Sequence, residues 1–231
     1  MSASKQNRID ILDGWRTLAV LFMVVWHALY DLAAVGAIPA AWMQSTASEL
    51  VRSFVSVSFI LLAGISCRFT RSNLRRGVKT LLAAMLVTAA TWAAGQPVWF
   101  GVLHLLGCGM LLYALVGKRW ERLPDGAAIG TGLILFAVTR LVTERVRVGV
   151  PGLWILGLRT AGFSSADYYP LLPWLPLFFA GAALGGMILK SDGAWKGKKL
   201  PAWATWPGRH ALIIYLVHQP ILWGVARWLA G

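Results

Sequence analysis

Residues 17–35, TLAVLFMVVWHALYDLAAV, decide the fold. The stretch is long enough to cross a bilayer, because a membrane-spanning helix needs about 20 largely apolar residues. Among its apolar side chains it carries His27 and Asp31. We therefore predict a transmembrane helix here that carries ionisable groups inside the membrane.

Six further apolar stretches of similar length follow along the chain. These predicted spans are residues 50–67, 78–95, 98–116, 126–143, 169–189 and 209–229. Hydrophobic residues make up 58% of the sequence and charged residues only 13%, whereas about a quarter of a soluble domain is charged. A disordered chain, a disulfide scaffold and an ordinary cytosolic enzyme are thereby excluded. The predicted fold class is all-α, a polytopic transmembrane helical bundle of about seven spans in one domain, residues 1–231.

The 22 Lys and Arg residues are distributed unevenly between the predicted loops. With the N-terminus in the cytoplasm, sixteen lie on the inner side, Lys5 and Arg8 among them, and six on the outer side. Basic loops favour the cytoplasmic side, so we predict a cytoplasmic N-terminus. The net charge of +13 then mainly orients the chain, and no nucleic-acid partner is expected. A cleaved signal peptide in residues 1–40 is the rival interpretation, but signal h-regions are shorter and do not usually carry His and Asp.

Three predicted spans carry polar side chains that lipid should exclude. His27 and Asp31 lie four residues apart, on one helix face. His104 lies in another span, and His218 with Gln219 in a third. An ionisable group near the bilayer centre costs about 2.5–3.5 kcal/mol on insertion scales, so such residues usually serve a function. From a helical rise of about 1.5 Å per residue, we expect all five at similar depths, between the midplane and the outer face.

These residue types suit acyl transfer. A neutral His is a general base near pH 7, and a nearby carboxylate can orient its imidazole. His218, Gln219 or a Tyr hydroxyl can donate hydrogen bonds to an oxyanion. Helix–helix hydrogen bonding is the alternative, especially for His104. No two His residues have a ligand spacing on one helix, so no metal is expected.

Glycines and motif patterns add little about chemistry. Gly181 and Gly185 form a small-xxx-small pair, which predicts a helix packing contact. The sequence contains no GxGxxG, Walker A, HExxH or GxSxG motif.

Several short motifs follow one another along nearly the whole chain. They are RID at 8–10, LDGWRTLA at 12–19, FMVVWH at 22–27, FILLAG at 59–64, GVLHLLG at 101–107, DYYPLLPW at 167–174, GRH at 208–210 and YLVH at 215–218. As an ordered set they resemble the heparan-alpha-glucosaminide N-acetyltransferase-like family of transmembrane acyltransferases, in particular its short bacterial members.

The resemblance implies a multi-pass enzyme of the bacterial inner (plasma) membrane. It would transfer an acetyl or other acyl group from cytoplasmic acyl-CoA to an acceptor on the far side, which we expect to be a glycan or lipid bearing an amino or hydroxyl group. His27 is the predicted general base, assisted by Asp31, and His218 is predicted to stabilise the oxyanion or bind the acyl group. The residues predicted to bind the acceptor are His104, Asp167, Tyr168 and Gln219. The residues predicted to contact the CoA phosphates, since guanidinium suits bidentate phosphate binding, are Arg16, Arg68, Arg71, Arg75 and Arg76.

The sequence also departs from the family pattern. His27 falls where the lysosomal members carry an active-site Asn, and Thr17 replaces a usual Gly. Residues 36–49 contain no His, although the lysosomal members have an active-site His in that loop. Either His27 has taken over the base role, or the chemistry differs, or activity is lost.

Other classes of function stay open from the sequence. A proton-coupled transporter or channel could use His27, Asp31 and His104 as a proton relay, although no inverted repeat is visible. A membrane scaffold is the third option. Direct transfer and an acyl-histidine intermediate are both open, as is the oligomeric state, a homo-oligomer included.

Overall fold

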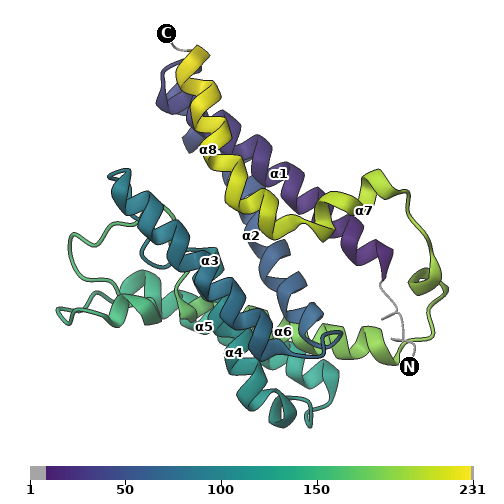
Figure 1. Ribbon diagram of the computed structural model, residues 1–231. Coiled ribbons are helices and arrows are strands. Elements are labelled where there is room, and N and C mark those ends of the chain that lie inside the picture. The colour runs from purple at the N-terminus through teal and green to yellow at the C-terminus, as the bar shows by residue number, and fades with distance from the viewer. Residues whose placement is uncertain (1–8, 230–231) are drawn as a thin grey trace. The chain divides into compact units, whose positions relative to one another are not determined.

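The computed structural model describes residues 9–229, and within that range it contains helices and no β-strand (Figure 1). The long helices are α1 (Asp10–Ala34), α2 (Thr46–Cys67), α3 (Asn73–Ala93), α4 (Val102–Trp120), α5 (Asp125–Arg145), α6 (Leu171–Lys190) and α8 (Ala211–Leu229). The short elements are α7 (Ala202–Arg209) and the 3-10 helices η1 (Ala40–Gln44), η2 (Leu153–Leu156) and η3 (Ala194–Gly197). The all-α prediction is confirmed.

Six of these helices are long and apolar enough to cross a membrane, namely α1, α2, α4, α5, α6 and α8. Helix α3 overlaps the predicted span 78–95 but is less hydrophobic than these six helices. The reason is that Arg75, Arg76 and Lys79 lie in its first two turns. A helical membrane bundle is therefore supported, and the seventh span stays a prediction. Lys5 and Arg8, which were assigned to the inner side, lie outside the described residues.

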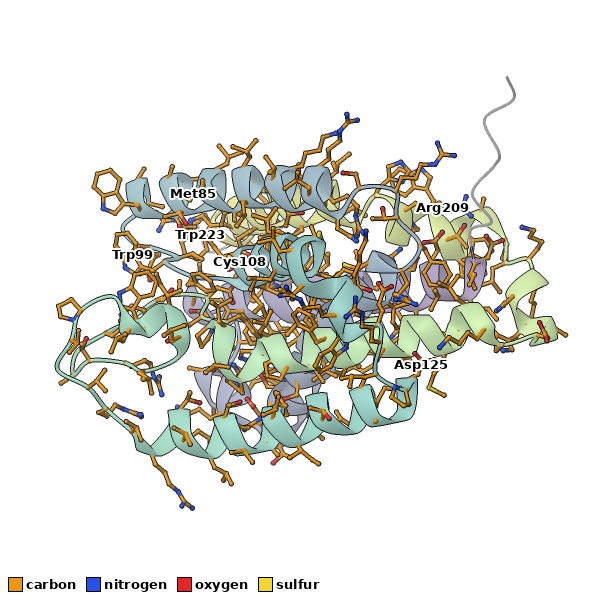
Figure 2. All side chains as sticks on the ribbon, turned by 90° about the horizontal axis from the view of Figure 1, so that it is seen from below. Met85, Trp99, Cys108, Asp125, Arg209 and Trp223 are labelled. Carbon is orange, nitrogen blue, oxygen red and sulfur yellow. The ribbon has the colours of Figure 1, made fainter. Side chains whose placement is uncertain are left out.

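Large apolar side chains cover much of the exterior. Met85 on α3 is 58% exposed and Trp223 on α8 is 42% exposed (Figure 2). Exposing apolar surface to water costs about 25 cal/mol per Å², a cost that lipid tails do not impose. This distribution fits a protein whose sides face lipid.

The chain divides into two compact units, residues 1–59 with 192–231, and residues 60–191. In the first unit, α7 and α8 pack along α1 (Figure 1). Two indole N–H groups of α1 donate to serines of α2: Trp15 to Ser58 Oγ at 3.1 Å and Trp26 to Ser48 Oγ at 3.0 Å. Helix α1 is thereby held on several sides, which positions the polar residues that it carries.

The second unit pairs α3 with α4 and α5 with α6. A Cβ added to Gly181 of α6 would lie 2.5 Å from the carbonyl oxygen of Leu61, and one added to Gly185 would lie 2.7 Å from that of Ile65. These glycines let the α6 backbone approach the end of α2 closely. The predicted packing role of the small-xxx-small pair is confirmed.

Helix α4 begins four residues later than the sequence predicted, at Val102 rather than residue 98. The intervening residues are tied to the segment before α6 instead. The Trp99 N–H donates to Ser165 Oγ, and the Tyr169 N–H donates to the Phe100 carbonyl. Asp167 then accepts a hydrogen bond from the Val102 N–H, which marks the first turn of the helix.

Candidate functional site

The first unit brings two of the intramembrane histidines together. The rings of His27 on α1 and His218 on α8 meet edge to face, with centroids 4.9 Å apart. His218 is buried, at 7% exposure. The sequence predicted similar depths for these two histidines, and in the structure their rings are in direct contact.

Each imidazole is anchored to its own helix through Nδ1. His27 Nδ1 lies 2.9 Å from the Met23 carbonyl oxygen, and His218 Nδ1 lies 2.7 Å from that of Tyr215. A carbonyl oxygen only accepts, so Nδ1 carries the hydrogen in both rings. In a neutral imidazole the other nitrogen, Nε2, then keeps its lone pair, which is the form that acts as a base or nucleophile.

Next to this pair, Asp31 and Gln219 join the same two helices. Gln219 Nε2 donates to the Asp31 carboxylate oxygens at 2.8 and 3.1 Å, and Asp31 is only 1% exposed. The sequence predicted that Asp31 assists His27, and that role stays a prediction. The hydrogen bond of His27 goes to the Met23 carbonyl, one turn earlier in its own helix, whereas the carboxylate binds an amide of α8.

Two buried polar atoms at this place have no hydrogen-bond partner among residues 9–229: His218 Nε2 and Gln219 Oε1. Both are acceptors, and they belong to adjacent residues of α8. Buried acceptors are normally satisfied, and an exception needs an explanation. A bound molecule with N–H or O–H groups would satisfy both atoms.

The tautomer also changes the role that His218 can play. To stabilise an oxyanion, as the sequence predicted, His218 would need a hydrogen on Nε2. In the neutral ring the hydrogen is on Nδ1. Neutral His218 is therefore an acceptor at Nε2. It becomes an Nε2 donor only after it takes up a proton.

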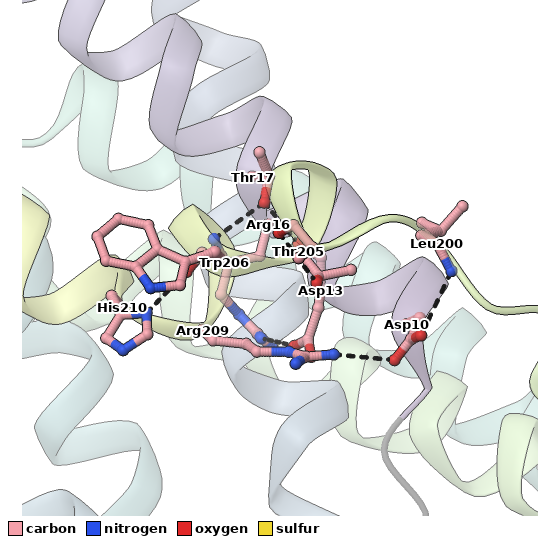
Figure 3. A network of polar contacts seen from close by, with 11 residues as sticks. Asp10, Asp13, Arg16, Thr17, Leu200, Thr205, Trp206, Arg209 and His210 are labelled. Atoms are coloured by element: carbon pink, nitrogen blue, oxygen red, sulfur yellow. Dashed lines mark hydrogen bonds and ion pairs between the residues drawn. The ribbon is translucent and has the colours of Figure 1, made fainter.

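A second polar cluster joins the start of α1 to α7 (Figure 3). Arg209 Nη2 lies 3.1 Å from Asp10, and its Nε lies 3.1 Å from Asp13. Arg16 pairs with the other oxygen of Asp13 at 2.7 Å. The Gly208 N–H donates to Thr17 Oγ1 at 2.9 Å. Arg16, predicted to bind CoA phosphate, is thus already paired with a carboxylate.

Sequence reasoning missed Arg209 and Asp10 as members of this cluster. Asp10 and Asp13 lie three residues apart, so they share a helix face. Two carboxylates on one face indicate a nearby cation. The partner is 196 residues away from Asp13 in the sequence, and spacing within α1 cannot identify it.

In the second unit, His104 contacts residues of its own unit. The Thr88 hydroxyl donates to the Val98 carbonyl at 2.7 Å and lies 3.3 Å from His104 Nε2. The hydroxyl hydrogen is used on Val98, so His104 Nε2 is the donor to Thr88. The ring also stacks on Phe100. This contact joins α4 to α3, the structural alternative that the sequence left open for His104.

Asp167 and Tyr168 also have hydrogen-bond partners within the second unit. Asp167 Oδ2 accepts from the Val102 N–H at 3.0 Å, where a carboxylate offsets the positive end of the helix dipole. The Tyr168 hydroxyl donates to the Trp154 carbonyl at 2.5 Å. Burial raises the pKa of Tyr168, although Arg159 partly offsets this. Their predicted contact with an acceptor stays a prediction.

The four remaining arginines predicted to bind phosphate lie at the turn between α2 and α3. Arg68 pairs with Glu121 at 2.5 Å. Burial alone would lower the pKa of Arg68, but hydrogen bonds to Tyr113 and Glu121 raise it above its ordinary value. Arg76 donates to the Ser66 carbonyl, whereas Arg71 and Arg75 are exposed. The predicted contact of these four arginines with the CoA phosphates stays a prediction.

No group of three or more His, Cys, Asp or Glu side chains that could hold a metal ion occurs in the described part of the chain. The expectation that no metal is bound stays a prediction.

A comparison with known families identifies a family model that matches most of the chain. The family model described as heparan-alpha-glucosaminide N-acetyltransferase, catalytic, matches residues 8–220 of the 231-residue chain. The matched region contains His27, His218 and the Asp–Arg cluster, whereas helix α8 continues beyond it to Leu229. No curated protein and no solved structure matches the chain.

Proposed function

Because this chain belongs to the heparan-alpha-glucosaminide N-acetyltransferase catalytic family, we propose that it is an integral membrane acyltransferase that uses acyl-CoA. The donor is acetyl-CoA or another acyl-CoA on the cytoplasmic side. The acceptor is a glycan or lipid with an amino or hydroxyl group near the outer half of the membrane. The excess of basic residues on the N-terminal side of the membrane supports this orientation, and a bacterial inner membrane is the proposed location.

The observation that carries the proposal is the imidazole pair. His27 and His218 are in ring contact, both Nδ1–H groups are used by backbone carbonyls, and the buried Nε2 of His218 has no partner within residues 9–229. Acyl transfer needs a group that removes a proton from a weak nucleophile. Two imidazoles with free Nε2 lone pairs meet that need.

The reaction follows from these groups. Nε2 of His27 takes the proton of the acceptor N–H or O–H as the acceptor attacks the thioester carbonyl carbon. A C–N or C–O bond forms and the C–S bond breaks. The His27 imidazolium then returns its proton to the CoA thiolate, so charges and protons balance. If Nε2 of His218 attacks the thioester carbon first, a C–N bond forms, the C–S bond breaks and CoA leaves as the thiolate. The acceptor then attacks the carbonyl carbon of this acyl-histidine, the C–N bond to Nε2 breaks, and the acceptor proton passes through Nε2 of His27 to the thiolate.

The arginines at the α2–α3 turn are proposed to bind the CoA phosphates. Arg75 and Arg71 are exposed, and a guanidinium group can bind a phosphate through two parallel hydrogen bonds. Arg16 and Arg68 are already paired with carboxylates, so we expect them to contribute less. Replacing Arg75 by Ala should raise the KM for acyl-CoA and leave kcat nearly unchanged.

The experiment that tests the function is thioester turnover by the purified chain in liposomes with radiolabelled acetyl-CoA and a mixture of membrane lipids and glycans. His27→Gln and His218→Gln should each lower turnover by about 10²–10⁴-fold, the usual contribution of a general base. His210→Gln is the matched control, because His210 Nδ1 also binds a backbone carbonyl one turn earlier but the residue lies outside the pair. Full activity in both test variants would refute the proposal. Proton flux that does not depend on CoA would instead identify a transporter.

A further inference from the structure

A short segment of the first unit, residues 194–206, combines exposed tryptophans with lysines. Trp203 is 78% exposed, Trp206 57% and Trp195 36%. Lys198 and Lys199 are exposed as well, and neither forms an ion pair within residues 9–229. No acidic residue follows Asp192 in the sequence. We call residues 194–206 the Trp–Lys segment.

The opposite side of this segment is fixed to α1. Thr205 is 1% exposed, and the neighbouring Gly208 is so close to α1 that an added Cβ would contact the Asp13 carbonyl oxygen. Leu200 N–H donates to Asp10. Helix α7 therefore has one face packed on α1 and one exposed face. Thr205 and Gly208 face α1, whereas Trp203 and Trp206, also three residues apart, face away from it.

We propose that the exposed side of the Trp–Lys segment is a binding surface for the headgroups of anionic bilayer lipids. Indole rings favour the region between headgroups and acyl chains, where an apolar body and an N–H group are both accommodated. Lysines beside them attract lipid phosphates, because the cytoplasmic leaflet is negatively charged. The two features occur together on one surface, and neither Lys198 nor Lys199 forms an ion pair within residues 9–229.

This surface goes beyond the proposed enzymatic activity. The inference that the lipid is one of the cytoplasmic leaflet rests on the proposed orientation of the chain. Lipid binding itself can be measured on the purified protein, whatever its orientation or enzymatic activity. The segment is attached to α1 through Leu200, and Gly208, two residues beyond its end, packs against the same helix, so lipid binding would have a structural effect. A headgroup held on the segment also holds the start of the helix that carries His27.

The test compares thermal unfolding of the full chain in neutral detergent supplemented with phosphatidylcholine or with phosphatidylglycerol, followed by far-UV circular dichroism. Phosphatidylglycerol should raise the melting midpoint by roughly 4–8 °C relative to phosphatidylcholine. The double variant Lys198→Ala/Lys199→Ala should lose most of that shift. Native mass spectrometry should show fewer retained phosphatidylglycerol molecules on this variant and on Trp203→Ala.

The matched control removes the same charge elsewhere. Lys118 and Arg119 are exposed at the end of α4, and Lys118→Ala/Arg119→Ala should keep the full shift. An equal loss in the control would mean that net charge alone acts, which overturns the proposal. An equal shift from inorganic phosphate at the same concentration of phosphate groups would also overturn it, because the ligand would then be a free anion such as the phosphates of CoA.

Discussion

The side-chain amide of Gln219 donates to both carboxylate oxygens of Asp31, at 2.8 and 3.1 Å. Each residue stands beside a histidine in its own helix, Gln219 directly after His218 and Asp31 one turn after His27. The amide is thereby oriented so that its oxygen, which has no partner within residues 9–229, lies on the other side of the group. The Asp31 carboxylate thus fixes the orientation of the Gln219 amide on α8.

Replacing Gln219 by Leu should destabilise the protein. Asp31 would keep a buried carboxylate without its donor, which costs about 1–3 kcal/mol. Thermal or denaturant unfolding in detergent measures the change. The double variant Asp31→Leu/Gln219→Leu should recover most of the loss, because removing both partners leaves no buried group unsatisfied. Additive losses would show that the two side chains do not depend on each other.

Gly181→Ala should destabilise the contact between α6 and the end of α2. The added Cβ would lie 2.5 Å from the Leu61 carbonyl oxygen, and such overpacking costs about 1–3 kcal/mol. Gly130→Ala in α5 is the control, because no atom lies within 4 Å of the added Cβ. That change should be neutral or stabilise the protein by up to about 1 kcal/mol. Equal effects in unfolding experiments would contradict the close approach.

Asp167→Ala should remove the side-chain cap of α4 and cost about 0.5–2 kcal/mol. Asp167→Asn should keep most of the stability, since the amide oxygen still accepts from Val102. Activity then separates the two interpretations of this residue. If Asp167 only caps the helix, the Asn variant is nearly as active as the wild type, whereas an acceptor-binding role predicts a raised acceptor KM in the Asn variant.

Gly101→Ala should be more harmful while Asp167 is present. An added Cβ would overlap the Asp167 carboxylate and lie 2.7 Å from Val98 Cγ1. In the Asp167→Ala background the first of these clashes is absent. A double-mutant cycle should therefore give a coupling of about 0.5–3 kcal/mol. A coupling near zero would contradict the placement of Asp167 over the start of α4.

Arg209→Met should leave Asp10 and Asp13 without their shared cation. Arg209 is partly exposed, at 35% for its side chain, so solvent reduces the cost to about 1–2 kcal/mol. Arg209→Lys should recover less than half of it, because an ammonium group cannot reach both carboxylates as the guanidinium does. Urea unfolding in detergent checks both variants, and a Lys variant as stable as the wild type would contradict the two-carboxylate contact.

The sequence predicted the helices and a similar depth for His27 and His218, but it did not predict that their rings are in contact. Long apolar runs form helices both in a membrane and in a protein core. The helical rise per residue gives the depth of each residue along its helix, and it predicted similar depths for His27 and His218. Depth says nothing of rotation about the axis or of rotamers. For that reason the sequence paired Asp31 with His27, whereas the carboxylate binds Gln219 on the facing helix.

The remaining differences involve contacts between distant parts of the chain. Helix α7, ending in Trp206-Pro207-Gly208-Arg209, lies in a stretch that the sequence placed in a loop, because Pro and Gly are weak helix formers. Contact with α1 through Gly208 and Arg209 stabilises it. Likewise, Asp167 caps a helix that begins 65 residues earlier. No local pattern predicts either pairing.

The Asp–Arg cluster fixes the start of α1, so a small change of tilt there moves the distant part of the helix that carries His27. Asp13 and His27 are separated by fourteen residues of one continuous helix, a length of about 21 Å. A tilt of about 5° around the cluster would carry the imidazole roughly 2 Å sideways at that length. Misplacement of a reacting group by about 1 Å can cost 100-fold in rate. Under the proposed function, the ion pairs of Arg209 with Asp10 and Asp13 would therefore help to keep the His27 ring in position, although they lie at the other end of the helix segment.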